Sequence, residues 1–276
     1  SGTVTSCITA VSSAGSKNYP SLNVQNVHPR VRPCIKAPDG WILCSIDLAQ
    51  MELCTLAQTC LNLFSRSVLA DRLNKGVDVH AYLGAQIAHL QDDVFVGAAT
   101  HFNANTDEDK YTLFRDMGKE ETYHPSYKRF RKIAKPVNLG YPGGMGPLKF
   151  VIYAKGMGVT VDLDTAHELK QVWLRTYPEM ESYFAAVKNM RDPRHPERFR
   201  YASPFGMFRS GCFFTQVANG YGLQTPAAEA MLITMIDIVT RVQTEPLFMP
   251  DRFKFLAVVH DEYLVLLKEH NIPKKG

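Results

Sequence analysis

The stretch Trp41-Ile42-Leu43-Cys44-Ser45-Ile46-Asp47 is a short apolar run that follows an Asp39-Gly40 turn signal and ends at an aspartate. Such a run is typical of a buried strand. From Ala49 to about Phe64 apolar residues recur at helical spacing, so we expect strand to give way to helix just after Asp47. This junction places a carboxylate where a strand stops.

A second aspartate takes a comparable place later in the sequence. Residues Phe253 to Leu267 are rich in strand formers on both sides of His260-Asp261, which predicts a hairpin with the polar pair at its tip. If this hairpin and the first strand are neighbours in one sheet, Asp47 and Asp261 point to one spot. Oxygen ligands of this kind suit Mg²⁺ better than Zn²⁺. The alternative, on these residues alone, is that each aspartate only initiates a turn.

The remaining segments alternate in type, without an internal repeat, and predict one compact α+β unit with sub-domains. The stretch from about Ala104 to His124 has few apolar residues and is expected to be a solvated connection or a surface excursion. Further helical patterns span about Val79 to Leu90, Tyr127 to Gly140, Asp164 to Thr176, Glu179 to Met190 and Ala227 to Gln243.

Composition excludes several classes of protein. With 45% hydrophobic residues among 276, the chain is not wholly disordered. No run of about 18 apolar residues exists, so no membrane span is expected, and nothing in the sequence is typical of a signal peptide. The 6 cysteines form no C-x-x-C pair, which predicts buried reduced thiols. A net charge of +4 is compatible with a polyanionic partner but does not demand one.

One helical segment combines cations with an apolar residue. Arg131, Lys135 and Leu139 are spaced at i, i+4 and i+8, which places them on one helical face about 12 Å long. Such a face can hold a triphosphate at one end and a base at the other. The alternative is a solvated basic stripe. Pro136 within this segment would cost about 3 kcal/mol and predicts a kink.

Several of these segments resemble motifs of one enzyme family. Asp47-Leu48-Ala49-Gln50-Met51-Glu52-Leu53 is similar to the first palm motif of family A DNA polymerases, the bacterial DNA polymerase I family. The run from Arg131 to Gly140 resembles their fingers helix, and Val259-His260-Asp261-Glu262 resembles their third motif. Further similar elements are Leu22 to Asn26, Gly76 to His80, Gln224 to Glu229, and Tyr141 to Gly144, the last suggesting a phage-type branch.

The resemblance implies an α+β fold of right-hand polymerase architecture, with an antiparallel palm sheet, a mainly helical fingers sub-domain and no thumb. It implies palm over residues 1–75, fingers over 76–185 with the nucleotide-binding helix near 127–140, and palm again over 186–276. The chain would then be a palm-and-fingers fragment whose thumb and exonuclease parts lie elsewhere in a parent chain. Its expected location is the cytoplasm of a bacterial or phage-infected cell.

The resemblance also implies an activity: DNA-templated transfer of nucleotides from deoxynucleoside triphosphates to a primer 3′-hydroxyl, with release of pyrophosphate, in DNA replication. Asp47 and Asp261, helped by the backbone carbonyl of Leu48, would hold two Mg²⁺ ions. Lys135 would donate a proton to pyrophosphate. Glu262 would act as an auxiliary metal contact or a structural partner.

The same resemblance implies two sets of binding residues. The incoming nucleotide would meet Gln50, Glu52, His80, Arg131, Lys135 and Leu139, with Glu52 excluding a 2′-hydroxyl. Primer-template DNA would meet Asn23, Gln25, Asn26, Arg30, Gln224 and His260. Gly143 stands where the family usually has an aromatic residue, so we expect template placement to depend on Tyr141 instead.

Two other classes of protein stay open. A single-subunit RNA polymerase or a reverse transcriptase shares a palm with paired aspartates, but Glu52 as a sugar gate argues against both. The second alternative is a non-catalytic nucleic-acid-binding module descended from a polymerase. Such a module needs the charges of Arg131 and Lys135 but not the paired carboxylates of Asp47 and Asp261.

Overall fold

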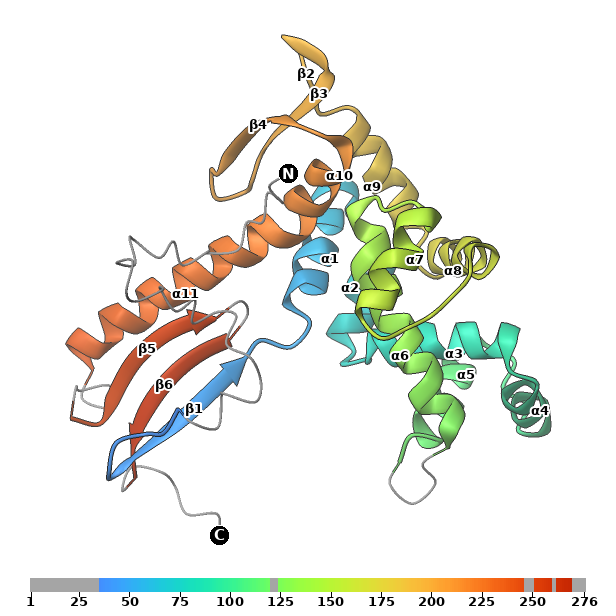
Figure 1. The fold of residues 1–276 in the computed structure, drawn as a ribbon, viewed down its shortest axis with the longest axis horizontal. Coiled ribbons are helices and arrows are strands. Elements are labelled where there is room, and N and C mark those ends of the chain that lie inside the picture. Colours follow the sequence, from blue (N-terminus) through green and yellow to red (C-terminus); the bar gives the residue numbers. More distant parts are fainter. Residues whose placement is uncertain (1–34, 120–123, 246–250, 260–261, 270–276) are drawn as a thin grey trace, which may run out of the picture. The chain divides into compact units, whose positions relative to one another are not determined.

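The computed structural model describes residues 35–119, 124–245, 251–259 and 262–269 (Figure 1). It confirms an α+β fold of many helices and two small antiparallel sheets. The chain divides into two compact units. The sheet unit comprises the described residues up to Met51 and from Gln224 onward, and the helical unit comprises Glu52–Leu223.

The sheet unit contains strands β1 (Trp41–Asp47), β5 (Phe253–Val259) and β6 (Glu262–Lys268). Their order is β1-β6-β5, and both pairings are antiparallel. Helix α11 (Thr225–Thr244) packs against β5, and the Tyr263 hydroxyl donates a hydrogen bond of 2.9 Å to the Met231 carbonyl (Figure 1). The predicted strand and the antiparallel pairing on either side of 260–261 are confirmed, but β1 contains no buried residue, so the expectation of a buried strand is wrong. The predicted tip, His260-Asp261, lies outside the described residues.

The helical unit contains the helix that carries Arg131, Lys135 and Leu139, and it contains the second sheet, β2-β3-β4. The helices predicted from periodicity are confirmed to within a few residues. The helices of this unit are α1 (Met51–Phe64), α2 (Val68–Asn74), α3 (Val79–Gln91), α4 (Asp93–His101), α5 (Asp107–Asp116), α6 (Pro125–Gly140), α7 (Pro147–Gly156), α8 (Leu163–Thr176), α9 (Glu179–Lys188) and α10 (Phe214–Asn219). The first residue of α1, Met51, belongs to the sheet unit. The strands are β2 (Arg191–Asp192), β3 (His195–Ala202) and β4 (Phe208–Cys212).

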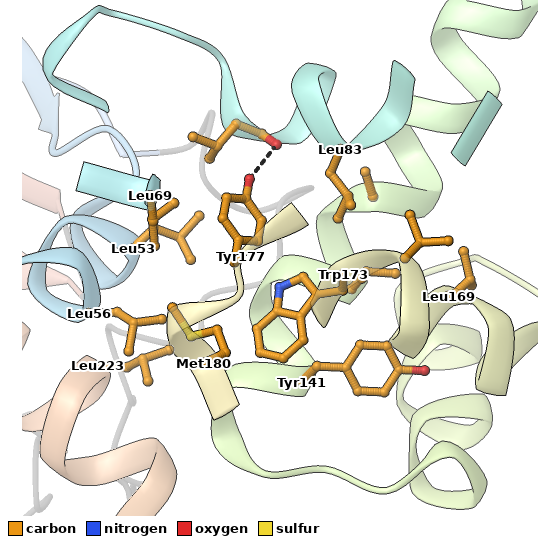
Figure 2. Packing of buried hydrophobic residues seen from close by; sticks show 14 of the residues in the cluster. Leu53, Leu56, Leu69, Leu83, Tyr141, Leu169, Trp173, Tyr177, Met180 and Leu223 are labelled. Atoms are coloured by element: carbon orange, nitrogen blue, oxygen red, sulfur yellow. Dashed lines mark hydrogen bonds between the residues drawn. The ribbon is translucent and has the colours of Figure 1, made fainter. Parts of the chain in front are cut away.

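Most of the largest fully buried side chains of the helical unit are aromatic, and Figure 2 shows Tyr141, Trp173 and Tyr177 packed among leucines. Trp173 is buried beside Tyr141 and Tyr177, with ring centroids 5.9 and 6.5 Å away. The Tyr177 hydroxyl reaches the Val79 carbonyl at 3.4 Å. Buried aromatic rings contribute large apolar areas, and the hydroxyls of buried tyrosines need such acceptors. The core therefore fixes the start of α3, where Asp78 is the N-cap residue and His80 lies in the first turn.

One expectation about this unit is correct only in part. The stretch from Ala104 to His124, expected to be a solvated connection or a surface excursion, is exposed or half-buried in its described part except at Ala104 and Phe114, but it contains helix α5. Thr106 and Asp109 form a capping box at its start. Phe114 is fully buried, with its ring 5.5 Å from that of Phe95. Phe114, with the partly buried Tyr111 and Leu113, thus anchors a helix whose other residues are mostly polar, and this is too weak a periodic signal to predict from sequence.

Helices α3 and α6 approach closely at Gly84. A Cβ atom on Gly84 would lie 3.2 Å from the backbone nitrogen of Arg131 and 3.1 Å from the Phe114 ring. Either distance is tighter than normal packing allows without movement. The absence of a side chain at Gly84 therefore sets how closely α6 lies against α3.

Candidate active site

Two carboxylates face each other at one end of the sheet unit's β1–β6 pair. Asp47, the last residue of β1, is directly opposite Glu262, the first residue of β6. Opposite residues of an antiparallel pair have Cα atoms about 4.5–5.5 Å apart. Asp47 is exposed, and the Ser45 hydroxyl donates a hydrogen bond to the half-buried Glu262 carboxylate. The pairing of the two predicted strands is confirmed, and it creates an accessible group of oxygen donors.

The second predicted metal ligand, Asp261, lies outside the described residues. So do Asn23, Gln25, Asn26, Arg30 and His260, which were predicted to contact DNA. Leu48 is described and half-buried. Within the described ranges, no group of three or more His, Cys, Asp or Glu residues is placed to hold a metal ion. The assignment of metal ligands therefore stays a prediction.

Two predicted polar residues of the sheet unit stand at irregular backbone. Gln50 has a φ of 56°, in the left-handed region that few residues other than glycine adopt. Its Oε1 atom is buried and has no hydrogen-bond partner in the part of the chain that the structure describes. Gln224 ends a π-helical turn, Gly220–Gln224, just before α11. Gln224 has ordinary helical dihedrals, so only Gln50 is strained, and residues strained in this way cluster at functional sites.

The cation stripe of the helical unit, defined as Arg131, Lys135 and Leu139, follows one accessible face of α6. Lys135 is exposed, and the other two side chains are half-buried. Pro136 lies inside α6, which continues to Gly140. The residues of the opposite face that hold α6 in the core are Phe130, Ala134, Val137 and Asn138. Packing of that face leaves the stripe open to a ligand.

Asp78 holds Arg131 in place. The Arg131 Nε donates to Asp78 Oδ2 at 2.9 Å, while Asp78 Oδ1 caps α3 by accepting from the backbone N–H groups of His80 and Ala81 at 3.0 Å. Burial would raise the pKa of Asp78, but the Ala81 bond and the Arg131 guanidinium outweigh it and lower that pKa. The carboxylate therefore stays ionised and orients the arginine.

His80 is neutral and its tautomer is fixed. Burial, with the nearby charges of Arg131 and Lys135 acting against that of Asp78, lowers its pKa to about 4. The Asn138 Nδ2 donates to the Val79 carbonyl at 3.1 Å and lies 3.2 Å from His80 Nδ1. Because an amide nitrogen only donates, His80 Nδ1 accepts, and the ring proton is on Nε2. His80 thus offers one N–H donor beside the cations.

A cavity of about 280 Å³ opens along the same helix. It lies at the small end of the range of ligand pockets. Lys128 and Lys132 join the two cations of the stripe in its wall, and none of the described residues that line it is acidic. The lining residues are Tyr127, Lys128, Arg131, Lys132, Lys135, Pro136 and Met157. The family pattern did not indicate Lys128 or Lys132, although their helical spacing from Arg131 and Lys135 could have done so.

Glu52 lies in the first turn of α1 and is half-buried. Burial, and then the Glu52 carboxylate, raise the pKa of Tyr153 on α7. The Tyr153 ring would lie 3.1 Å from a Cβ atom on Gly140, the last residue of α6. Tyr153 therefore connects the predicted sugar gate to the end of the helix that carries Leu139. Sequence reasoning missed Tyr153 because only the fold brings it near Glu52.

The expected role of Tyr141 is wrong. Its side chain is fully buried, its ring lies 4.4 Å from that of Phe150, and its hydroxyl donates to the Ala166 carbonyl (Figure 2). It cannot meet a template base from there. At Gly143 a Cβ atom would lie 3.2 Å from Asn219 Oδ1, so Asn219 fills space beside the glycine.

No family model matches the chain. A DNA polymerase I of Aquifex aeolicus (strain VF5) is 22% identical over 259 residues, which cover 94% of this chain and 38% of that protein. Among solved structures, the chain is similar to the POL domain of Pol1 from M. smegmatis in complex with DNA primer-template and dNTP. That match has a TM-score of 0.61 and 17% identity, and it covers 90% of this chain and 38% of the other.

The resemblance to the family A DNA polymerases is confirmed. The match to the polymerase domain supports the α+β fold. The chain spans 38% of the length of the polymerase relative with which it aligns. No helix in the described ranges is long and apolar enough to cross a membrane.

Proposed function

We propose that the chain is a DNA-templated DNA polymerase unit that transfers nucleotides from deoxynucleoside triphosphates to a primer 3′-hydroxyl during replication. The observation that carries this proposal is the accessible cation stripe on α6, with the neutral, oriented His80 beside it. The similarity to a DNA polymerase I over 94% of the chain supports it. Palm and fingers roles for 1–75, 76–185 and 186–276 are part of the proposal, as are thumb and exonuclease parts elsewhere in a parent chain.

The triphosphate would lie along α6. Asp78 occupies the Arg131 Nε, which directs the remaining guanidinium donors toward phosphate. The exposed Lys135 ammonium supplies a second cation and the proton for the leaving pyrophosphate, and the His80 Nε2–H supplies a neutral donor. Charge stabilisation by groups held before the reaction is the largest contribution expected in phosphoryl transfer.

The metal ligands would be Asp47, the Leu48 carbonyl and Asp261, holding two Mg²⁺ ions. The oxygen donors at the end of the β1–β6 pair fit such a hard cation. When bound, the ions would neutralise developing phosphate charge and activate the primer hydroxyl. Within the chain itself, the β1–β6 register positions Asp47, and Ser45 holds the Glu262 carboxylate.

Glu52 would cover the sugar of the incoming nucleotide and exclude a 2′-hydroxyl, with Gln50 nearby in sequence and Leu139 against the base or sugar. Tyr153, whose pKa is raised by the Glu52 carboxylate after burial, would hold that carboxylate toward the end of α6. Asn23, Gln25, Asn26, Arg30, Gln224 and His260 would contact the primer-template duplex.

Primer extension with Mg²⁺ and deoxynucleotides tests the proposal, using the chain with and without its native flanking sequence. Lys135→Ala should lower kcat/KM for the nucleotide about a hundredfold, because it removes a charge aimed at the phosphates. Lys149→Ala, which removes an exposed lysine from α7, is the matched control and should leave the rate unchanged. Equal rates for both variants would contradict the proposed role of α6.

The same assay separates the alternatives. If the chain is a DNA polymerase, Glu52→Ala should admit ribonucleotides; a wild-type chain that already prefers ribonucleotides would favour an RNA polymerase. A chain that binds primer-template without Mg²⁺ and never extends it, in any length of sequence, would favour the non-catalytic module.

A further inference from the structure

The second sheet has an inner face that is anchored in the helical unit. Phe199, Tyr201 and Cys212 are buried. The Phe199 ring lies 5.9 Å from Phe214, and the Tyr201 ring lies 6.0 Å from Tyr221. These contacts attach β3 and β4 to α10 and the turn that follows it. The strands therefore need no packing on their other face to stay in place.

The outer face of the same strands carries cations and aromatic rings. Arg200 is exposed between the two buried aromatic residues of β3. On β4, Phe208 pairs with the exposed Ala202 and is itself 61% exposed. Phe213 follows β4, is 56% exposed, and has the Arg198 guanidinium 4.0 Å from its ring centroid. We call Arg198, Arg200, Phe208 and Phe213 the hairpin platform.

The acidic residues of this hairpin lie elsewhere. Glu197 has the strand parity of the buried Phe199, opposite to that of Arg198 and Arg200, and it pairs with His195 at 3.8 Å. Asp192 on β2 is buried and accepts from the backbone N–H of Arg194. The hairpin platform is therefore positively charged, and its exposed rings have no carboxylate beside them on the strand face described.

This chemistry matches an unpaired polynucleotide strand. Planar rings, one with a guanidinium stacked on it, are surfaces on which bases stack, and the arginines match phosphates in charge. A duplex keeps its bases stacked in its interior, so it would not use the exposed rings. Phe205, in the turn that joins β3 to β4, is another exposed aromatic residue of this hairpin and is 59% exposed.

We propose that the hairpin platform binds a single-stranded DNA segment, with bases stacked on Phe208 and Phe213 and phosphates against Arg198 and Arg200. The identity of that segment as the unpaired template strand rests on the proposed function. Binding itself needs neither a nucleotide nor Mg²⁺, so it is separable from catalysis.

The experiment is fluorescence anisotropy of a labelled oligothymidylate with the full chain, in the absence of Mg²⁺ and nucleotides. Phe208→Ala and Phe213→Ala should each weaken binding about tenfold. Phe102→Ala removes an equally exposed ring from the end of α4 and should leave binding unchanged. Arg198→Ala and Arg200→Ala should each reduce the slope of log K against log salt by about 0.7, whereas the phenylalanine variants should not change that slope.

A blunt duplex of the same label completes the test. The phenylalanine variants should bind the duplex as wild type does; an equal loss for both ligands would overturn the stacking proposal. Wild-type affinity in Phe208→Ala and Phe213→Ala, or no binding of the single strand by wild type, would also overturn it. Circular dichroism of each variant checks folding. Loss of primer extension with intact strand binding would contradict the proposed function and leave the hairpin platform standing.

Discussion

The carboxylates of the sheet unit and the groups behind the cation stripe of the helical unit differ in exposure and in hydrogen bonding. Asp47 is exposed at the end of a strand, and Glu262 accepts a hydrogen bond from the Ser45 hydroxyl. Behind the stripe, Asp78 and His80 are less accessible, are held by several hydrogen bonds and have lowered pKa values. The comparison teaches that Asp47, which would meet an ion, stays accessible, while Asp78 and His80 behind the stripe are half-buried or buried and held by hydrogen bonds.

The largest effect should come from the accessible side of this comparison. Asp47→Ala should reduce primer extension about a thousandfold or more, because it removes a proposed metal ligand. It should change the free energy of unfolding by no more than about 0.5 kcal/mol, because the side chain is exposed. Extension assays and urea unfolding measure the two quantities. Asp39→Ala, an exposed aspartate just before the same strand, is the control. Comparable rates for the two variants would contradict the metal assignment.

Because His80 is buried, the free energy of unfolding should depend on pH. The pKa of His80 is about 4 in the folded chain and about 6.5 in an unfolded one. Between those values the unfolded state binds more protons, so stability is complete above about pH 6.5 and falls by about 3 kcal/mol as the pH is lowered to about 4. Urea unfolding across this range should give a shallower slope for His80→Gln than for wild type.

His167→Gln serves as the control for that measurement, because His167 is exposed on α8. Its slope should equal that of wild type. If His80→Gln kept the wild-type slope as well, His80 would not be the group that resists protonation.

A smaller effect should separate the two roles of Asp78. Asp78→Asn keeps an oxygen that caps α3 but loses the charge that orients Arg131, so nucleotide affinity should fall about fivefold to tenfold. Asp78→Ala also loses the cap and should cost about 1 kcal/mol more in stability. Calorimetric titration with a deoxynucleotide and urea unfolding would measure these changes. Wild-type affinity in both variants would show that Arg131 needs no partner.

The smallest effect should come from Ser45. Ser45→Ala removes a hydroxyl that holds the Glu262 carboxylate, and a hydrogen bond of this kind contributes about 0.5–1.5 kcal/mol. Primer extension should fall a few-fold, and Ser45→Thr, which keeps a hydroxyl, should restore it. An unchanged rate in Ser45→Ala would mean that Glu262 is held by the sheet alone.

Periodicity predicted those parts of the fold in which apolar residues recur regularly. The strand ending at Asp47, strands β5 and β6 and helices such as α3 and α6 belong to this group. Of these, α6 buries one face, whereas α3 is buried on most sides and β1 contains no buried residue. The predicted cation stripe also follows from helical spacing alone. Its accessibility could be predicted from the apolar residues on the opposite face of α6.

The rest depended on features that a single segment does not carry. In β4 the register with β3 shifts between Phe199 and Tyr201, and Gly211 has a φ of 68°, so alternation of apolar residues is broken. The proximity of Tyr153 to Glu52 comes from tertiary packing. Tyr141 lies just after the end of α6, where helical periodicity no longer predicts which side is buried. Only the fold shows that its side chain enters the core.

Gly84 is buried between α3 and α6, and a Cβ atom there would press on the backbone of α6 at Arg131. Any larger residue must push that helix outward or tilt it, carrying the cation stripe with it. In a genetic screen for altered nucleotide use, a substitution of Gly84 would therefore be scored with the binding residues. The screen would then detect a change in the spacing of α3 and α6 behind the site, not a change in a residue that contacts the nucleotide.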